Sequence, residues 1–201
     1  MRSLPLAAIA AVALLPGAWG GMASGAAPGD GSAPPAAVST PPAPAVSTPP
    51  APTVPAELAP LSFLLGKWQA GTNTGTLGQG SGWCSFERGL RDRVIVRTNH
   101  AEYPASEKRA AAAHDDLMVI YVAGGAVEAR YFDSEGNLIH YSVSSPESGQ
   151  AVFLGDAAPD APRYRLTYKL RGDGVLEGTF EVAPPGKPEE FARFLSWESH
   201  R

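Results

Sequence analysis

The stretch RYRLTYKL at residues 163–170 gives the clearest indication of the fold. Tyr164, Leu166, Tyr168 and Leu170 alternate in it with arginine, threonine and lysine, so one side is apolar and the other polar. Because successive side chains of a β-strand point to opposite faces, this alternation predicts a strand with one buried face and one face in water. Antiparallel sheets commonly have that arrangement, whereas strands of parallel sheets are apolar on both faces.

Similar segments, separated by turn residues, recur about every 14 residues along the rest of the chain. The predicted strands are 67–73, 81–88, 92–99, 116–123, 127–133, 138–144, 151–154, 164–170, 175–182 and 191–199, after a short helix at 56–65. These ten strands and their mostly short, sequential connections predict an all-β fold, a single antiparallel up-and-down β-barrel. Closure into a barrel removes the unpaired edges of the sheet. A sandwich of two sheets is the alternative architecture.

The N-terminal part of the chain has a different composition from the rest. Residues 1–60 contain only three charged side chains and hold 13 of the 20 prolines. Arg2, the apolar stretch LPLAAIAAVALL and the small residues after it predict a signal peptide over residues 1–25. Residues 26–57 repeat AVSTPPAP and have too few apolar side chains to offset the entropy of ordering, which predicts a disordered Pro/Ala-rich linker. The barrel domain is then expected at residues 58–201.

Charge and cysteine content exclude several classes of function. The 201 residues carry a net charge of −4, so we expect no nucleic-acid partner. Cys84 is the single cysteine, which excludes an intrachain disulfide and any site with several cysteine ligands. The chain has no P-loop, dinucleotide fingerprint, nucleophile elbow or HExxH pair. We therefore expect an exported protein, periplasmic or secreted, without a cofactor or a bound metal. An uncleaved N-terminal segment would be its one contact with a membrane.

Gly66-Lys67-Trp68 follows the predicted helix and opens the first predicted strand. This resembles the GxW signature of the calycins, the superfamily of lipocalins and fatty-acid-binding proteins. Together with LSFLLGKW, SFERGL, ARYFDSEG and a last strand that contains tryptophan, the chain is similar to a bacterial lipocalin-like family of undefined function over about residues 58–201. The resemblance implies that Trp68 packs across the closed end of a barrel beneath a late basic side chain, Arg193 or Arg201. It implies no particular chemistry, because fold does not determine function.

In an up-and-down barrel the longest predicted connections gather at one end, which we call the mouth. Binding residues concentrate on such loops when a rigid scaffold holds them. If Val94, Val96 and Thr98 face inward, so does His100, at the lip of the barrel. Inward tyrosines would add apolar area and a hydrogen-bonding tip for a ligand. The candidate ligand-binding residues are His100, Tyr103, His114, Asp115, Tyr121, Tyr131 and Tyr168.

Three functions compete on this basis. The first is a non-enzymatic carrier of a small apolar or amphipathic molecule, bound at the mouth beneath a lid formed by residues 100–115. The second is an enzyme or metal site at the rim, with His100 or His114 as base and Asp115 or Glu102 orienting it; Asp133 can also reach that region. The third is a structural module on a Pro-rich stalk, with a filled barrel and an exposed apolar patch on its outer wall.

Overall fold

The computed structural model describes residues 54–75, 79–107 and 109–201. The predicted signal peptide lies outside this part of the chain, and so does all of the predicted linker up to residue 53. The elements are η2 (Ala56–Leu64), a 3₁₀ helix, and the strands β1 (Gly66–Gly75), β2 (Ser81–Gly89), β3 (Val94–Tyr103), β4 (Ala112–Ala123), β5 (Ala126–Asp133), β6 (Leu138–Ser144), β7 (Gln150–Gly155), β8 (Arg163–Leu170), β9 (Leu176–Ala183) and β10 (Ala192–His200). None of the helical structure within the described residues is long and apolar enough to cross a membrane.

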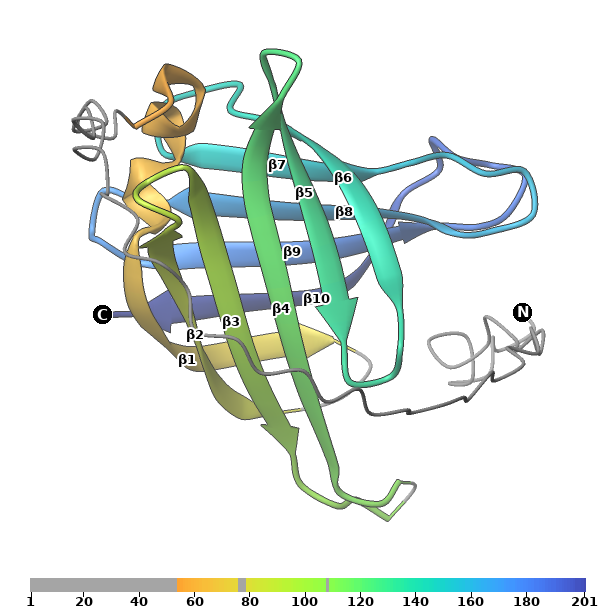
Figure 1. The fold of residues 1–201 in the computed structure, drawn as a ribbon. Coiled ribbons are helices and arrows are strands. Elements are labelled where there is room, and N and C mark those ends of the chain that lie inside the picture. The colour runs from red at the N-terminus through yellow and green to blue at the C-terminus, as the bar shows by residue number, and fades with distance from the viewer. Residues whose placement is uncertain (1–53, 76–78, 108) are drawn as a thin grey trace, which may run out of the picture. The chain divides into compact units, whose positions relative to one another are not determined.

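The ten strands form one closed antiparallel barrel in which each strand pairs with the next along the chain (Figure 1). The last strand, β10, pairs back onto β1, where Gln69 lies opposite His200 and Thr74 opposite Ser196. The prediction of a single up-and-down barrel with a short helix before it is therefore confirmed, and the sandwich alternative is excluded. Closure leaves no unpaired strand edge in the described barrel.

The hairpin of β3 and β4 is longer than predicted. Its pairing continues from His100 opposite Asp115 to Tyr103 opposite Ala112, so only residues 104–111 remain as the connection. The prediction of a long lid over residues 100–115 is therefore wrong for half of its length, because residues 100–103 and 112–115 belong to the paired strands. Polar side chains suggested a loop there, but in the structure they alternate between the two faces of regular strands.

The helix η2 closes the end of the barrel opposite the mouth. Leu58, Leu61 and Leu64 are buried in the core, and Leu64 accepts a 2.7 Å hydrogen bond from the indole nitrogen of Trp68, which is fully buried. The guanidinium of Arg201 lies 4.4 Å from the centre of a Trp68 ring and donates to two carbonyl oxygens beside the helix. Arg193 is exposed on β10, so Arg201 is the arginine that covers Trp68.

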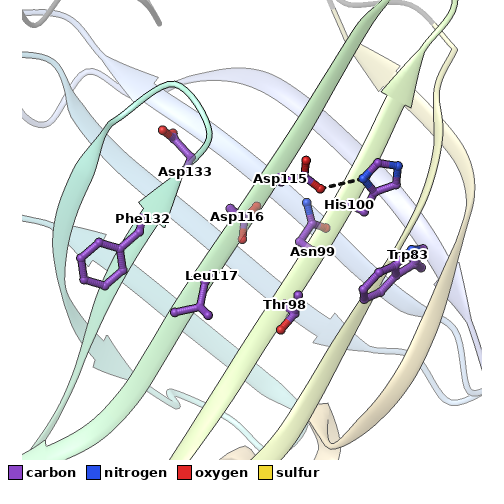
Figure 2. A pocket seen from close by; sticks show the side chains of 9 residues that line it. All are labelled: Trp83, Thr98, Asn99, His100, Asp115, Asp116, Leu117, Phe132 and Asp133. Atoms are coloured by element: carbon purple, nitrogen blue, oxygen red, sulfur yellow. Dashed lines mark hydrogen bonds and ion pairs between the residues drawn. The ribbon is translucent and has the colours of Figure 1, made fainter.

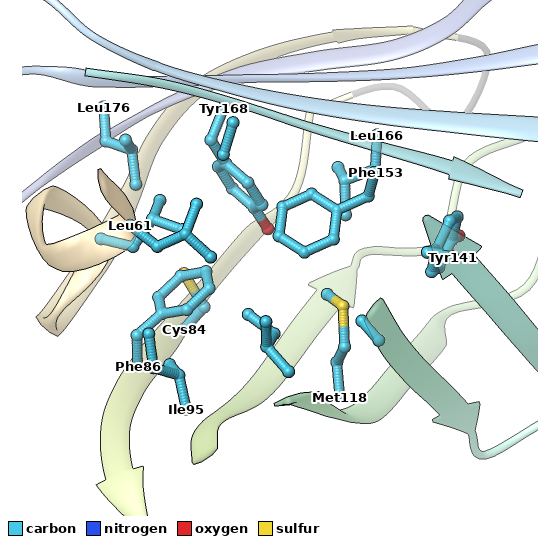
Figure 3. Close-up of a cluster of buried hydrophobic side chains, with 14 of the residues drawn as sticks. Leu61, Cys84, Phe86, Ile95, Met118, Tyr141, Phe153, Leu166, Tyr168 and Leu176 are labelled. Carbon is cyan, nitrogen blue, oxygen red and sulfur yellow. The ribbon is translucent and has the colours of Figure 1, made fainter. Parts of the chain in front are cut away.

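Aromatic rings pack against one another inside the barrel in edge-to-face contact, and we call them the aromatic layer (Figure 3). Tyr168 meets Phe86 with ring centres 5.4 Å apart and Phe153 at 6.1 Å, and Phe153 meets Tyr141 at 6.2 Å. All four rings are almost completely buried. Burial of each contributes about 1.5–3 kcal/mol, and the ring geometry adds a further fraction. This aromatic layer gives the core one definite packing.

Candidate functional site

An ion pair lies inside the barrel, next to the aromatic layer. Arg97 projects inward from β3 and Asp116 from β4, and their side chains form a direct salt bridge. The two residues are only 4% and 7% exposed, so each charge depends on the other for its stabilisation. Burial lowers the pKa of Arg97, but the Asp116 carboxylate, together with smaller contributions from Tyr168, Cys84 and Tyr131, outweighs this and raises the pKa above its ordinary value. Arg97 therefore stays charged inside the barrel.

The inward position of Arg97 reverses the predicted orientation of β3. Ile95 and Arg97 are buried, so Val96, Thr98 and His100 point to the outer wall. The expectation that His100 faces the interior is therefore wrong. A strand with apolar residues at three successive positions fits either face of a sheet, and the buried partner of Arg97 on β4 decides between them.

Two polar atoms beside this ion pair have no hydrogen-bond partner among the described residues. They are Nε of Arg97 and the hydroxyl oxygen of Tyr168. The guanidinium carbon lies 5.9 Å from the centre of the Tyr168 ring, and Tyr168 is fully buried. Burial raises the pKa of Tyr168 above its ordinary range, so the hydroxyl keeps its proton and is a donor. Leaving such a group without a partner costs about 1–3 kcal/mol, which indicates that a water molecule or a ligand atom belongs there.

A chain of polar contacts leads from the ion pair to the mouth. His114 Nε2 lies 3.3 Å from Asp116 Oδ2 and 3.1 Å from the hydroxyl oxygen of Tyr131. His114 Nδ1 lies 2.8 Å from Glu135 Oε2, in the turn between β5 and β6. Burial lowers the pKa of His114, but the carboxylates of Asp116 and Glu135 outweigh it and raise the pKa. Three of the predicted binding residues, His114, Tyr131 and Tyr168, therefore face the interior on or beside this chain.

Aromatic side chains near the mouth are less buried than those of the aromatic layer. Tyr164 and Phe180 stack with ring centres 5.7 Å apart, and Phe194 meets Phe180 edge-on at 6.2 Å. These three and Tyr131 are partly exposed, whereas Phe153 deeper in the barrel is fully buried. The interior is thus apolar and closed at the helix end, and more accessible towards the mouth.

His100 belongs to a different surface, on the outside of the barrel. Its Nδ1 lies 2.7 Å from Asp115 Oδ1 and its Nε2 lies 3.2 Å from Glu102 Oε1, and the Asp115 contact is the main cause of its raised pKa. It lines a shallow outer depression of about 380 Å³, together with Asp115 and Trp83 (Figure 2). His100 and His114 therefore lie on opposite faces of the barrel wall. The rim enzyme that would use both imidazoles has no common site for them.

Three exposed apolar side chains and one threonine form a row across the same outer wall. Thr98, Leu117, Phe132 and Leu138 are successive cross-strand partners on β3, β4, β5 and β6. Leu117 is 41% exposed, Phe132 46% and Leu138 63%. We call these four residues the outer row. It is the kind of patch that the structural-module hypothesis expected.

Two further predicted residues lie away from the interior site. Tyr121 faces outward and donates a 3.0 Å hydrogen bond to Glu128, so its predicted place in the barrel lining is wrong. It lines a second depression, of about 520 Å³, next to Pro55 and Glu57 at the helix end. Tyr103 is buried at the end of β3, where Arg109 lies 5.6 Å from its ring centre.

Sequence reasoning missed the Arg97–Asp116 pair. The signal that could have found it is an arginine and an aspartate on consecutive predicted strands of one hairpin, each flanked by apolar residues.

A scan against protein-family models and a search of the curated proteins returned no match to this chain. The structure itself defines a closed antiparallel β-barrel of ten strands, with a short helix across one end and a buried ion pair inside. This architecture is compatible with the calycin fold.

Proposed function

We propose that the protein is an exported, non-enzymatic carrier that binds a small amphipathic molecule inside the barrel, entering by the mouth. The two unpartnered buried polar atoms, Arg97 Nε and the Tyr168 hydroxyl, are the observation that carries this proposal. Both are donors, and an oxygen atom of a ligand accepts from either of them. The rest of the ligand then contacts aromatic and aliphatic side chains between this point and the mouth.

The charges around the site define the ligand further. Asp116 already neutralises Arg97, so the interior has no uncompensated positive charge to attract a strong anion. A neutral carbonyl or hydroxyl head on an apolar body matches two hydrogen-bond donors in an aromatic setting. Tyr164 and Phe180, partly exposed near the mouth, supply apolar contact for the body of such a molecule.

Export is supported by the sequence of residues 1–25, with its basic start, apolar stretch and small residues. The test is the mass of the protein recovered from a bacterial host. A product that lacks about 20–25 N-terminal residues is the expected result. A product of full length would contradict cleavage.

Ligand binding is tested first by native mass spectrometry of protein purified from the cells that make it, repeated after denaturation. A mass excess that disappears on denaturation is expected. The methyl ester of dansyl-labelled undecanoic acid, which has a neutral carbonyl head, then serves as the dye for a fluorescence titration. The dye should bind wild type with about one equivalent, and more weakly to Tyr168→Phe, which loses one donor without leaving a cavity.

The matched control for the titration is Leu117→Ala, on the outer wall, which should bind the dye like wild type. Circular dichroism and thermal melting verify that both variants are folded. A bare mass together with no dye binding would overturn the proposed carrier function. Equal loss of binding in Tyr168→Phe and Leu117→Ala would place the dye elsewhere and also contradict it.

The outer row favours a second candidate function, an interaction module that docks a partner protein through this wall. Three exposed apolar side chains lie next to one another on β4, β5 and β6, and contiguous exposed apolar surface is a feature of protein interaction sites. Because the barrel has no free strand edge, docking there must use side chains. A partner with an apolar surface segment is the matching chemistry.

The second candidate function is tested by comparing wild type with Phe132→Lys, both in a measurement of self-association and in a pull-down of partner proteins. Leu90→Lys is the control, because Leu90 is 76% exposed but stands in the turn between β2 and β3. Loss of an identified partner in Phe132→Lys alone supports the interaction module. Equal partner binding by both variants contradicts it.

A further inference from the structure

His114, Asp133 and Glu135 form the one group in the described part of the chain whose imidazole and carboxylate atoms converge as metal ligands do. One atom from each residue lies within 4.8 Å of the other two. His114 comes from β4, Asp133 ends β5, and Glu135 stands in the following turn, so three adjacent segments meet at the mouth. This group is separate from the unpartnered atoms on which the proposed carrier function rests.

The turn holds the Asp133 carboxylate in place. Its Oδ1 accepts hydrogen bonds from the backbone nitrogens of Glu135 at 3.1 Å and Asn137 at 2.8 Å, and its Oδ2 accepts one from the Asn137 side chain at 2.8 Å. A carboxylate has about four acceptor positions, so one remains for a further contact. Asp133 is therefore a ligand whose orientation is set before any ion arrives.

His114 has the support that metal-binding histidines usually have. A histidine that ligates a metal by one ring nitrogen commonly donates its other N–H to a carboxylate. Here Nε2 lies 3.3 Å from the buried carboxylate of Asp116, whose other oxygen is paired with Arg97. Nδ1 is the nitrogen that faces Glu135, at 2.8 Å. The imidazole is thus oriented by a buried group outside the cluster, with one nitrogen turned to the other side chains.

The other two described histidines that have carboxylate partners also have one carboxylate on each ring nitrogen, but they lack the additional converging carboxylate that Asp133 provides beside His114. His100 contacts Asp115 through Nδ1 and Glu102 through Nε2, and His140 contacts Asp156 and Glu128 in the same divided way. The two nitrogens of an imidazole point in divergent directions, so one ion cannot contact the ring and both carboxylates. Neither histidine belongs to a converging group of three within the described residues.

We propose that His114, Asp133 and Glu135 bind a divalent zinc ion at the mouth, with water completing the coordination. One imidazole nitrogen and two carboxylate oxygens suit zinc, whereas calcium and magnesium prefer oxygen ligands alone. Glu135 is on an exposed turn and closes on the ion by a change of rotamer. The ion takes the place of the proton between His114 Nδ1 and Glu135, and that proton leaves to solvent.

The test is isothermal titration of the untagged full chain with zinc chloride, after removal of metal with EDTA. Wild type should bind about one equivalent. Glu135→Gln keeps the backbone contacts of the turn but removes a charged ligand, and it should weaken zinc binding at least tenfold, as should His114→Asn. The matched control His100→Asn removes a histidine with the same kind of carboxylate partners and should bind zinc like wild type.

The proposal is overturned if wild type takes up no zinc, or if Glu135→Gln binds zinc as tightly as wild type. Equal weakening in His100→Asn and His114→Asn would show diffuse binding by surface histidines and would also overturn it. A parallel titration with calcium chloride checks the ligand chemistry, and calcium binding as tight as zinc binding contradicts the zinc assignment. Circular dichroism spectra of all variants confirm that losses do not come from unfolding.

Discussion

At the scale of single residues, the ion pair of Arg97 and Asp116 is the most unusual feature of this barrel. Taking two charges out of water costs free energy that their mutual attraction only partly returns. Around them are Phe86, Tyr168 and Met118, none of which offers a charge. A buried pair in such a setting is a specific contact between β3 and β4, and it determines which face of β3 points inward.

Removing one partner of this pair should be more damaging than removing both. Arg97→Met leaves the Asp116 carboxylate buried and unpaired, so we expect a loss of about 3–5 kcal/mol in the free energy of unfolding. The double variant Arg97→Met with Asp116→Leu should recover most of that loss. Urea denaturation of the two variants and wild type measures this. A double variant as unstable as the single one would show that the pair itself stabilises the fold.

The thiol of Cys84 should be protected in the native protein. Cys84 is 4% exposed, and burial raises its pKa, so little reactive thiolate is present near neutral pH. We expect slow reaction with a disulfide reagent at pH 8 and fast reaction after unfolding in urea. Complete labelling of the native protein within the mixing time would contradict this placement of Cys84.

At the scale of elements, the turns between strands depend on residues that adopt left-handed backbone angles. Gly174, in the turn between β8 and β9, has a φ of +84°, and a side chain there would meet no other atom within 4 Å. The cost of replacing it is therefore purely one of backbone conformation. Gly172, in the same turn, has equally free surroundings without the left-handed φ.

Gly174→Ala should lower the free energy of unfolding by about 1 kcal/mol, because an L-residue with a Cβ is strained at positive φ. Gly172→Ala is the matched control and should be close to neutral. Thermal or urea unfolding of the two variants provides the comparison. Equal stability of the two variants would contradict the conformational explanation.

The contact of His140 with Asp156 ties β6 to the connection after β7, and it should be visible in the titration of the imidazole. The hydrogen bond that the His140 ring donates to Asp156 is the main cause of the raised pKa of His140. The folded state binds the proton more tightly than the unfolded state, whose histidine pKa is about 6.5. The stabilisation is therefore fully present below that pH and is lost as pH rises through the folded pKa.

We expect Asp156→Asn to lower the pKa of His140 towards its ordinary value, as measured by NMR of the ring protons against pH. The pKa of His100 should not change in this variant, because its partners are Asp115 and Glu102. An unchanged pKa of His140 would show that the Asp156 contact is absent in solution.

At the scale of the whole molecule, Arg201 joins the last strand of the barrel to the helix that precedes the first strand. β10 pairs with β1, and Arg201 then reaches the carbonyl oxygens of Phe63 and Leu65 at 3.1 Å each while it covers Trp68. These contacts connect the C-terminus of the domain to the helix that closes the barrel. They add to the strand pairing without contributing to the core.

Arg201→Ala should therefore lower the free energy of unfolding by about 1 kcal/mol, from the lost hydrogen bonds and the lost cation–π contact. Arg193→Ala, which removes an exposed arginine of β10, is the control and should have almost no effect. Urea unfolding of both variants measures the difference. A larger loss in Arg193→Ala would reverse the roles assigned to the two arginines.

The amino-acid sequence by itself determined the class of fold and the positions of the strands. Alternation in segments such as RYRLTYKL is a local property of the chain, and the turns between segments limit how the strands connect, so ten strands and an up-and-down order were predictable. The position of Trp68 at the closed end of the barrel was also predictable, from the resemblance of a local motif to the GxW signature.

Only the tertiary structure decided which side of β3 is inside and which residues meet there. Val94, Ile95 and Val96 are apolar at successive positions, so the period of two has no preferred face, and a solvent-facing Arg97 was the simpler expectation. The choice depends on Asp116, 19 residues away, whose charge compensates Arg97 only when both point inward. The stability of this pair depends on two residues that are distant in the sequence and adjacent in the fold, so no local pattern of the sequence predicts it.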